Sequence, residues 1–168
     1  VEPAASEPVT FDQKVCTFLP HAMLVRTGQT INVLNGDNVL HNTHSNPLNG
    51  DTETFNKGVA PNDRTGIPMV YAGAERVPVS VVCDIHNWMR AWHLPLDHDF
   101  AAISGEDGSF EIANLPPGEH EFVIWHEGDY LDRKYKVTIK PGETTEVDLS
   151  YGASDLARRD GGFKSINI

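Results

Sequence analysis

Short runs in which hydrophobic and polar side chains alternate recur along the first half of the chain. The alternation is clearest at residues 31–34, and a β-branched run leads directly into Cys83. A period of two predicts strands with one buried face. Strands are expected at residues 18–25, 30–35, 77–82 and 90–96. The first two meet at a turn around Gly28 and are expected to pair as a hairpin.

Between and after these runs the chain is rich in turn-forming residues. Residues 45–63 hold many Asn, Asp, Gly and Pro residues and are expected to form a long irregular loop. The second half repeats the pattern of short strands and turns. Its strands are expected at residues 121–125, 135–139 and 144–149. Helical periodicity and internal repeats are not evident, so the pattern predicts an all-β sandwich or barrel.

Composition narrows the classes of function. The chain has 168 residues, 39% of them hydrophobic, and a net charge of −11. Nucleic-acid binding is not expected, since phosphate contacts need clustered Lys and Arg. A membrane span is not expected either, because no apolar stretch approaches about 18 residues. The acidity favours a basic protein partner, since long-range attraction raises encounter rates.

The chemistry-bearing residues concentrate in one short segment after the 77–82 strand. Cys83, His86 and Met89 supply a thiolate, an imidazole and a thioether within seven residues. Soft sulfur together with nitrogen suits copper in both of its oxidation states. A short loop wraps only one side of an ion, so a further ligand is expected from elsewhere. His41, which follows the 30–35 strand, is the best source.

This combination resembles the cupredoxins, the blue copper proteins, over residues 10–98. Family members carry a first His, often followed by Asn, after an early strand, and the Cys, second His and Met in one late loop. The resemblance implies a Greek-key β-sandwich with copper held by His41, Cys83, His86 and Met89. It also implies electron exchange with a redox protein, here expected to be basic and cytochrome-like. The Cys-x2-His-x2-Met spacing is shorter than in plastocyanin-like members.

Several other residues are candidates for accessory roles. Asn42 and Trp88 are expected to support the ligands from outside the coordination sphere. Accessory metal ligands or supporting groups are expected among Cys16, His21, His44, His93 and His98. Three possibilities stay open for Cys16: a free buried thiol, a ligand in an accessory or dinuclear site, or a disulfide to Cys83.

A second module is expected after the copper-binding domain. Residues 107–118 resemble carboxypeptidase regulatory-like, transthyretin-like β domains, which implies a structural role for residues 99–151. Residues 1–9 are expected to form a flexible leader left after signal-peptide removal, and residues 152–168 a tail. The leader implies export to the periplasm or the cell exterior.

The function that these features indicate is electron transfer through a mononuclear copper site. An enzyme is not expected, because the sequence shows neither an acid–base pair nor a Ser-His-Asp set. The alternative is a copper storage or delivery protein. It would use the same ligands in a more exposed form, with a second or dinuclear site that recruits Cys16 and further histidines.

Overall fold

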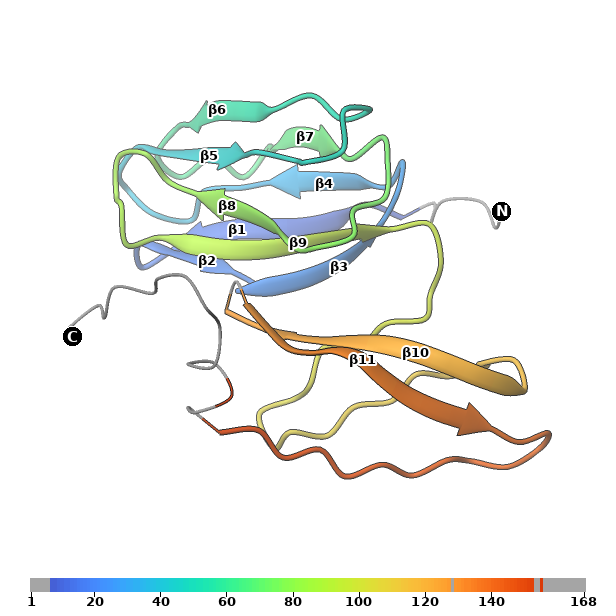
Figure 1. Ribbon diagram of the computed structural model, residues 1–168. Coiled ribbons are helices and arrows are strands. Elements are labelled where there is room, and N and C mark those ends of the chain that lie inside the picture. The colour runs from blue at the N-terminus through green and yellow to red at the C-terminus, as the bar shows by residue number, and fades with distance from the viewer. Residues whose placement is uncertain (1–6, 128, 153–154, 156–168) are drawn as a thin grey trace. The chain divides into compact units, whose positions relative to one another are not determined.

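All elements assigned in the described part of the chain are strands, which confirms the predicted all-β class (Figure 1). The computed structural model describes residues 7–127, 129–152 and 155. The strands are β1 (Val9–Lys14), β2 (Thr17–Leu19), β3 (Ala22–Arg26), β4 (Thr30–Val33), β5 (His41–Ser45), β6 (Phe55–Val59), β7 (Ile67–Val70), β8 (Val79–Val82), β9 (Arg90–Leu96), β10 (Gly118–His126) and β11 (Asp129–Ile139). The chain divides into two compact units, Val1–Ala113 and Asn114–Ile168.

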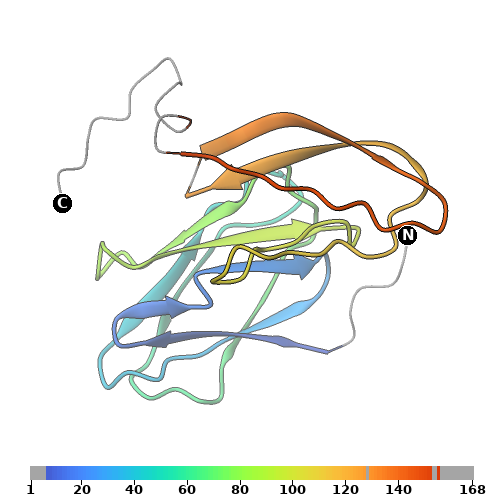
Figure 2. The same ribbon diagram turned by 90° about the horizontal axis from the view of Figure 1, so that it is seen from below.

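Two sheets form the first unit as a β-sandwich (Figures 1 and 2). One sheet has the order β2-β1-β4-β7, and the other has the order β3-β9-β8-β5-β6. The pairs β1–β4 and β3–β9 are parallel, and the other neighbouring pairs are antiparallel. Each sheet therefore combines strands from distant parts of the sequence.

The core lies between these two sheets. Alternate residues of β4 and β8 are buried, as their hydrophobic pattern predicts. Both sheets supply apolar side chains to one cluster: Phe11, Phe18, Met23, Val25, Ile31, Val33, Val59, Met69, Tyr71, Val79, Val81, Cys83, Met89 and Ala91. Because Cys83 and Met89 belong to this cluster, the loop that carries them is anchored in the core.

The predicted hairpin of residues 18–25 and 30–35 is wrong. Pro20 lacks a backbone N–H, and the first run divides there into β2 and β3. The turn at Gly28, with φ of 79°, then carries the chain from one sheet to the other. β3 and β4 therefore supply apolar side chains to the shared core from opposite sheets, rather than pairing edge to edge.

The expected irregular loop at residues 45–63 also contains a strand. β6 pairs antiparallel with β5 at the edge of the five-stranded sheet. Most of its residues are exposed, so it lacks the alternation that marks a strand with one buried face. β7, at the edge of the other sheet, was likewise not expected.

The second unit contains an antiparallel pair, β10 and β11, whose register shifts near Ile124. These strands include the predicted runs 121–125 and 135–139, whereas residues 144–149, also predicted as a strand, carry none. Whether this unit is a carboxypeptidase regulatory-like domain stays a prediction. The proposed leader lies mostly in residues 1–6, and the proposed tail mostly in 153–154 and 156–168, outside the described residues.

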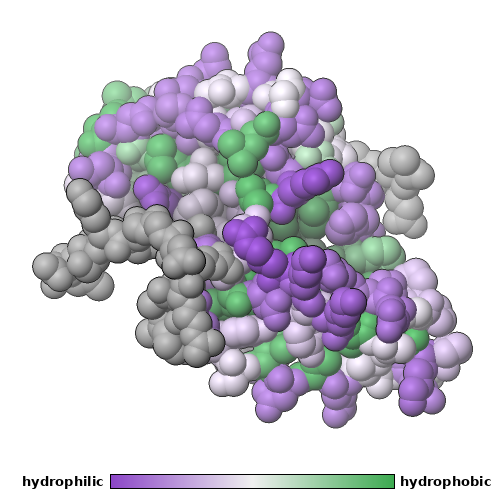
Figure 3. Space-filling model, viewed as in Figure 1, coloured by the Kyte–Doolittle hydropathy of each residue, from purple (hydrophilic) through white to green (hydrophobic). Residues whose placement is uncertain are grey.

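In the face shown in Figure 3, hydrophilic residues predominate and apolar residues are scattered among them. No helix in the described residues combines the length and apolar character that a membrane crossing requires.

Candidate metal centre

Strand pairing brings the predicted ligands from distant sequence positions to one end of the five-stranded sheet. β5 pairs with β8 in a register that sets His44 opposite Val82. His41 begins β5, and Cys83 follows the last residue of β8. Continuing the antiparallel register toward the start of β5 sets residues 41–43 beside residues 83–85. The register thus brings His41 and Cys83 to the same end of the sheet.

Three donor atoms converge at this end. The Nδ1 atoms of His41 and His86 are 2.9 Å apart, and the Cys83 Sγ atom lies 4.0 Å and 3.8 Å from them, respectively. Bonds of about 2.0 Å to nitrogen and about 2.3 Å to sulfur allow two donors of one ion to stand at most about 4.3 Å apart. All three separations satisfy that limit. The donor set of one thiolate and two imidazoles therefore fits a single transition-metal ion, and suits copper.

Hydrogen bonds within the loop between β8 and β9 hold the cysteine and the second histidine. The Cys83 amide donates to the Met89 carbonyl at 3.3 Å, and the Met89 amide donates to the His86 carbonyl at 2.9 Å. The His86 amide donates to the Cys83 Sγ atom at 3.4 Å. The loop is thus a tight turn closed around the sulfur.

Burial differs among the four predicted ligands. His41, Cys83 and Met89 are buried, with exposed fractions of 0%, 1% and 2%, whereas His86 is half-buried. Met89 packs in the core cluster, directly after the turn that holds Cys83 and His86. Its role as axial ligand stays a prediction. Among the four predicted ligands, His86 is therefore the one that reaches solvent.

The carboxylate of Asp37 is a site residue that the sequence did not single out. Its Oδ2 atom is 2.9 Å from Nε2 of His41, the ring nitrogen that does not face Cys83. Burial acts to raise the pKa of Asp37, but hydrogen bonds from the Cys16 amide, from His41 and from the Val15 amide together hold that pKa below its usual value. Asp37 is therefore an anion bonded to a predicted ligand.

On the other side of Cys83, the Asn42 side chain connects β5 to the loop that follows β8. Its Oδ1 accepts from the Asp84 amide at 2.7 Å, and its Nδ2 donates to the Asp84 carboxylate at 2.8 Å. His44 lies 3.0 Å from the same carboxylate, so the structure places His44 against Asp84 rather than against the three donors. Hydrogen bonds from His44, then from Asn42 and Asn56, lower the pKa of Asp84.

Trp88 and Cys16 meet beside the half-buried histidine. The Trp88 ring is 66% exposed and contacts the His86 ring edge-on, at 5.2 Å between centroids. Its indole N–H donates to the Cys16 carbonyl at 3.3 Å. Both cysteines are free, so the disulfide alternative for Cys16 is wrong in this structure. Cys16 instead offers its sulfur within 4.8 Å of donor atoms of Asp37 and His41.

The remaining candidate histidines lie elsewhere. His93 is fully buried in β9, bonded through Nδ1 to the Tyr71 hydroxyl at 3.1 Å. His21 is exposed just before β3, and its carbonyl accepts from Trp92. Within the described residues, neither group of three or more potential metal donors includes His21, His44, His93 or His98.

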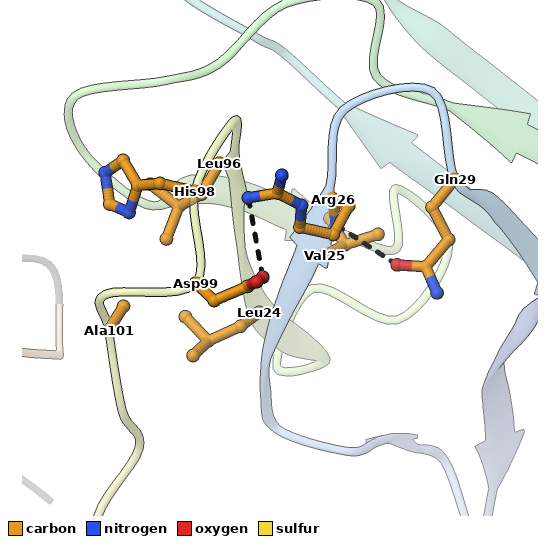
Figure 4. Close-up of a pocket in the computed structure, with 8 residues that line it drawn as sticks. All are labelled: Leu24, Val25, Arg26, Gln29, Leu96, His98, Asp99 and Ala101. Atoms are coloured by element: carbon orange, nitrogen blue, oxygen red, sulfur yellow. Dashed lines mark hydrogen bonds and ion pairs between the residues drawn. The ribbon is translucent and has the colours of Figure 1, made fainter. Parts of the chain in front are cut away.

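His98 lines a pocket at the other end of β9 (Figure 4). The pocket also contains Arg26, whose guanidinium pairs with Asp99 at 3.4 Å. A seven-residue strand such as β9 spans about 20 Å, and the ligand loop precedes its first residue. His98 is therefore separated from the three donors by the length of the sandwich.

The chain is similar to several solved copper proteins. They include a Cu-containing nitrite reductase from Thermus scotoductus SA-01 (18% identity, TM-score 0.46, 58% of this chain and 24% of that chain). An amicyanin from Paracoccus versutus gives 16% identity and a TM-score of 0.44 over 55% of this chain and 84% of that chain. A purple cupredoxin from Nitrosopumilus maritimus gives 18% identity and a TM-score of 0.43 over 52% of this chain and 99% of that chain.

The chain thus spans about a quarter of the nitrite reductase and most of the two smaller proteins. One of these proteins is a cupredoxin by name, the family that the sequence resembles. Neither a protein-family model nor a curated protein sequence matches the chain.

Proposed function

We propose that this chain is a copper-binding electron carrier. His41, Cys83 and His86 would hold one copper ion, and Met89 would supply a further, weaker sulfur donor. The convergence of these two imidazole nitrogens and one sulfur, within 4.0 Å of one another, is the observation that carries the proposal.

The way in which the chain holds the donors suits a carrier. Bound copper supplies a one-electron couple between Cu(II) and Cu(I). His41 is fixed by the sheet and Cys83 by the core, while hydrogen bonds of the turn fix His86. Donors held so firmly move little when the charge of the ion changes, and a small rearrangement favours fast transfer.

Exposed apolar side chains lie close in sequence to both His41 and the half-buried His86. Val39 and Leu40 precede His41, and Ile85 and Trp88 flank His86, with exposed fractions of 40%, 51%, 51% and 66%. We assign partner contact to these side chains and electron exit to the His86 edge. The net charge of −11 favours a basic redox protein as the partner.

The burial of His41 and Cys83 favours a carrier over a storage or delivery protein. A delivery site must present its ligands to an acceptor, and these two ligands are 0% and 1% exposed. In this proposal the chain acts as a carrier and not as an enzyme. Its location in the periplasm or outside the cell stays a prediction, which fractionation of the native host checks.

The test is an optical and EPR spectrum of the copper-loaded, oxidised protein, which reports thiolate ligation and nuclearity together. Cys83→Ser is expected to abolish the intense thiolate-to-copper absorption, because a protonated hydroxyl is a poor ligand compared with a thiolate. Cys16→Ser is the matched control and is expected to retain the band. Survival of the band in Cys83→Ser, with its loss in Cys16→Ser, contradicts the ligand assignment.

A further inference from the structure

One carboxylate, that of Asp37, connects the His41 side chain to a turn that is distant in sequence. Asp37 Oδ1 accepts from the Val15 amide at 2.6 Å. Asp37 Oδ2 accepts from the Cys16 amide at 2.8 Å and lies 2.9 Å from His41 Nε2. Val15 and Cys16 form the turn between β1 and β2. Three N–H groups from two segments therefore converge on one side chain.

This contact determines which nitrogen of His41 carries the proton. A neutral imidazole has one N–H donor and one acceptor nitrogen. A carboxylate only accepts, so the bond to Asp37 places the proton of His41 on Nε2. The lone pair is then on Nδ1, the nitrogen that faces Cys83 and His86. A neutral His41 is thus prepared to bind a metal before any metal arrives.

The turn on the other side of the carboxylate is strained. Val15 and Cys16 both have positive φ, 55° and 49°, in the left-handed region that favours glycine. Val15 is also 80% exposed, so packing does not hold it there. Strained backbone of this kind persists only when its surroundings determine it. The β1–β2 pairing on either side, the Thr17 hydroxyl on the Val15 carbonyl and the Trp88 indole on the Cys16 carbonyl help to hold it. The two hydrogen bonds to Asp37 fix its amides and tie the turn to the metal centre.

Asp37 is itself held by the core. Its amide donates to Oδ1 of Asn35 at 2.9 Å. Asn35 is fully buried, and its Nδ2 donates to the carbonyls of Val39 and Val59 at 2.8 Å and 3.0 Å. The carboxylate thus extends from a fixed point inside the sandwich. It provides a rigid reference for both the ligand and the turn.

A second metal position made by Cys16, Asp37 and His41 is the competing interpretation, since one donor atom from each lies within 4.8 Å of the others. Both oxygens of Asp37, however, are already engaged by N–H groups. A metal there would displace the bonds that hold the Val15–Cys16 turn. The observed contacts therefore favour a positioning role for the carboxylate.

We propose that Asp37 is the positioning residue of the metal centre. Its carboxylate holds His41 with the proton on Nε2 and the Nδ1 lone pair toward the metal, and it holds the Val15–Cys16 turn beside that histidine. This inference rests on the proposed copper site. Groups that orient metal-binding histidines typically contribute about 10–100-fold to metal affinity.

The first measurement uses the metal-free full-length protein. Long-range ¹H–¹⁵N NMR of the imidazoles reports which nitrogen of His41 carries the proton. The wild type is expected to show the proton on Nε2, and Asp37→Ala is expected to lose that preference. Asp12→Ala is the matched control, because the Asp12 carboxylate also accepts a hydrogen bond from another side chain, that of Arg64, and is 19% exposed, against 14% for Asp37. The control is expected to keep the wild-type tautomer.

The second measurement is Cu(I) affinity by competition with a chromophoric chelator. Asp37→Ala is expected to bind about 10–100-fold more weakly than the wild type, whereas Asp12→Ala keeps the wild-type affinity. If Asp37→Ala unfolds, the double variant Asp37→Ala/Val15→Gly relieves the strained turn, because glycine adopts positive φ readily. This double variant is expected to fold and still to lack the tautomer preference and the affinity.

The proposal is overturned if Asp37→Ala keeps the wild-type tautomer and affinity. It is also overturned if the double variant recovers both, because Asp37 would then serve only the turn. Failure of the wild type to bind copper would instead refute the proposed function. The tautomer measurement, made without metal, would still decide the role of Asp37.

Discussion

His41, Cys83 and His86 differ in how the chain holds them, and this difference assigns them different roles. His41 and Cys83 lie on or directly after strands and are buried, whereas His86 lies on the turn between β8 and β9 and is half-buried. The buried pair keeps water from the centre, which helps to set the potential of a bound metal. The half-buried histidine provides the contact with solvent and partner.

Replacing Met89 tests whether its sulfur acts on the centre. Met89→Leu is expected to retain copper, because three strong ligands remain, and to raise the reduction potential by removing an axial donor and drying the site. The exchange conserves volume and costs less than about 1.5 kcal/mol of stability. Voltammetry and the optical spectrum measure the effect.

Met69→Leu is the matched control for that exchange. Met69 is also buried, at 3% exposed, but lies on β7 in the opposite sheet. Its replacement is expected to leave the potential unchanged. Equal potentials for the wild type and Met89→Leu would mean that Met89 only packs in the core.

The sequence indicated the converging residues but not the one that orients them. Cys83 and His86 share one short segment, and His41 follows a strand, so residue type and spacing were sufficient signals. Asp37 lies between Gly36 and Asn38, where an aspartate is an ordinary turn residue. Its role depends on Val15 and Cys16, more than 20 positions away, and no local pattern shows such contacts.

At the scale of elements, local patterns predicted strands better than their partners. Residues 90–96 were predicted as a strand with the bounds that β9 has, and burial alternates along it although polarity does not. The predicted pairing of β3 with β4 was wrong, because β3 pairs in parallel with β9. Pairing across such a separation depends on how the two sheets share one core, and a short window of sequence does not contain that information.

The buried side chain of His93, on β9, makes the stability of the fold depend on pH. Burial lowers the pKa of His93 from its ordinary 6.5 to about 3. Between pH 6.5 and about pH 3, His93 is mostly protonated in the unfolded chain and mostly neutral in the folded chain. The contribution of neutral His93 to the free energy of unfolding is therefore fully present above pH 6.5. It is lost as the pH falls toward 3, by about 1.4 kcal/mol per pH unit at most.

Replacing this histidine is expected to weaken the acid dependence. Urea unfolding of metal-free His93→Gln from pH 7 to pH 4 should show a shallower loss of stability than the wild type, by about one proton. His98→Gln, at an exposed histidine, is the matched control and should follow the wild type. Parallel curves for the wild type and His93→Gln would contradict the role assigned to burial.

At the scale of the whole molecule, the acidic charge is expected to guide the partner. Salt screens long-range attraction over about 8 Å at physiological ionic strength. The second-order rate of electron transfer to a basic redox protein should therefore fall steeply as salt rises, while the copper spectrum stays constant. Stopped-flow rates at low and high salt measure this dependence.

Charge reversal locates the part of the surface that attracts the partner. Glu119 and Glu121 are exposed on β10, and Asp51 and Glu53 are exposed in the first unit. Either double change to Lys adds four charges, so the net charge becomes −11 + 4 = −7. If the partner docks on the second unit, only the change of Glu119 and Glu121 to Lys should slow electron transfer to the partner. Equal effects of both pairs would show that net charge alone acts.

The edge contact between Trp88 and His86 also gives the protein a built-in optical probe. The two ring centroids are 5.2 Å apart, while the indole itself is largely in solvent. An excited indole so close to a redox-active ion transfers its energy or an electron to that ion and stops emitting. Fluorescence from Trp88 should thus be quenched as copper fills the centre and should return when copper is removed. Occupancy could then be followed at protein concentrations too dilute for absorption.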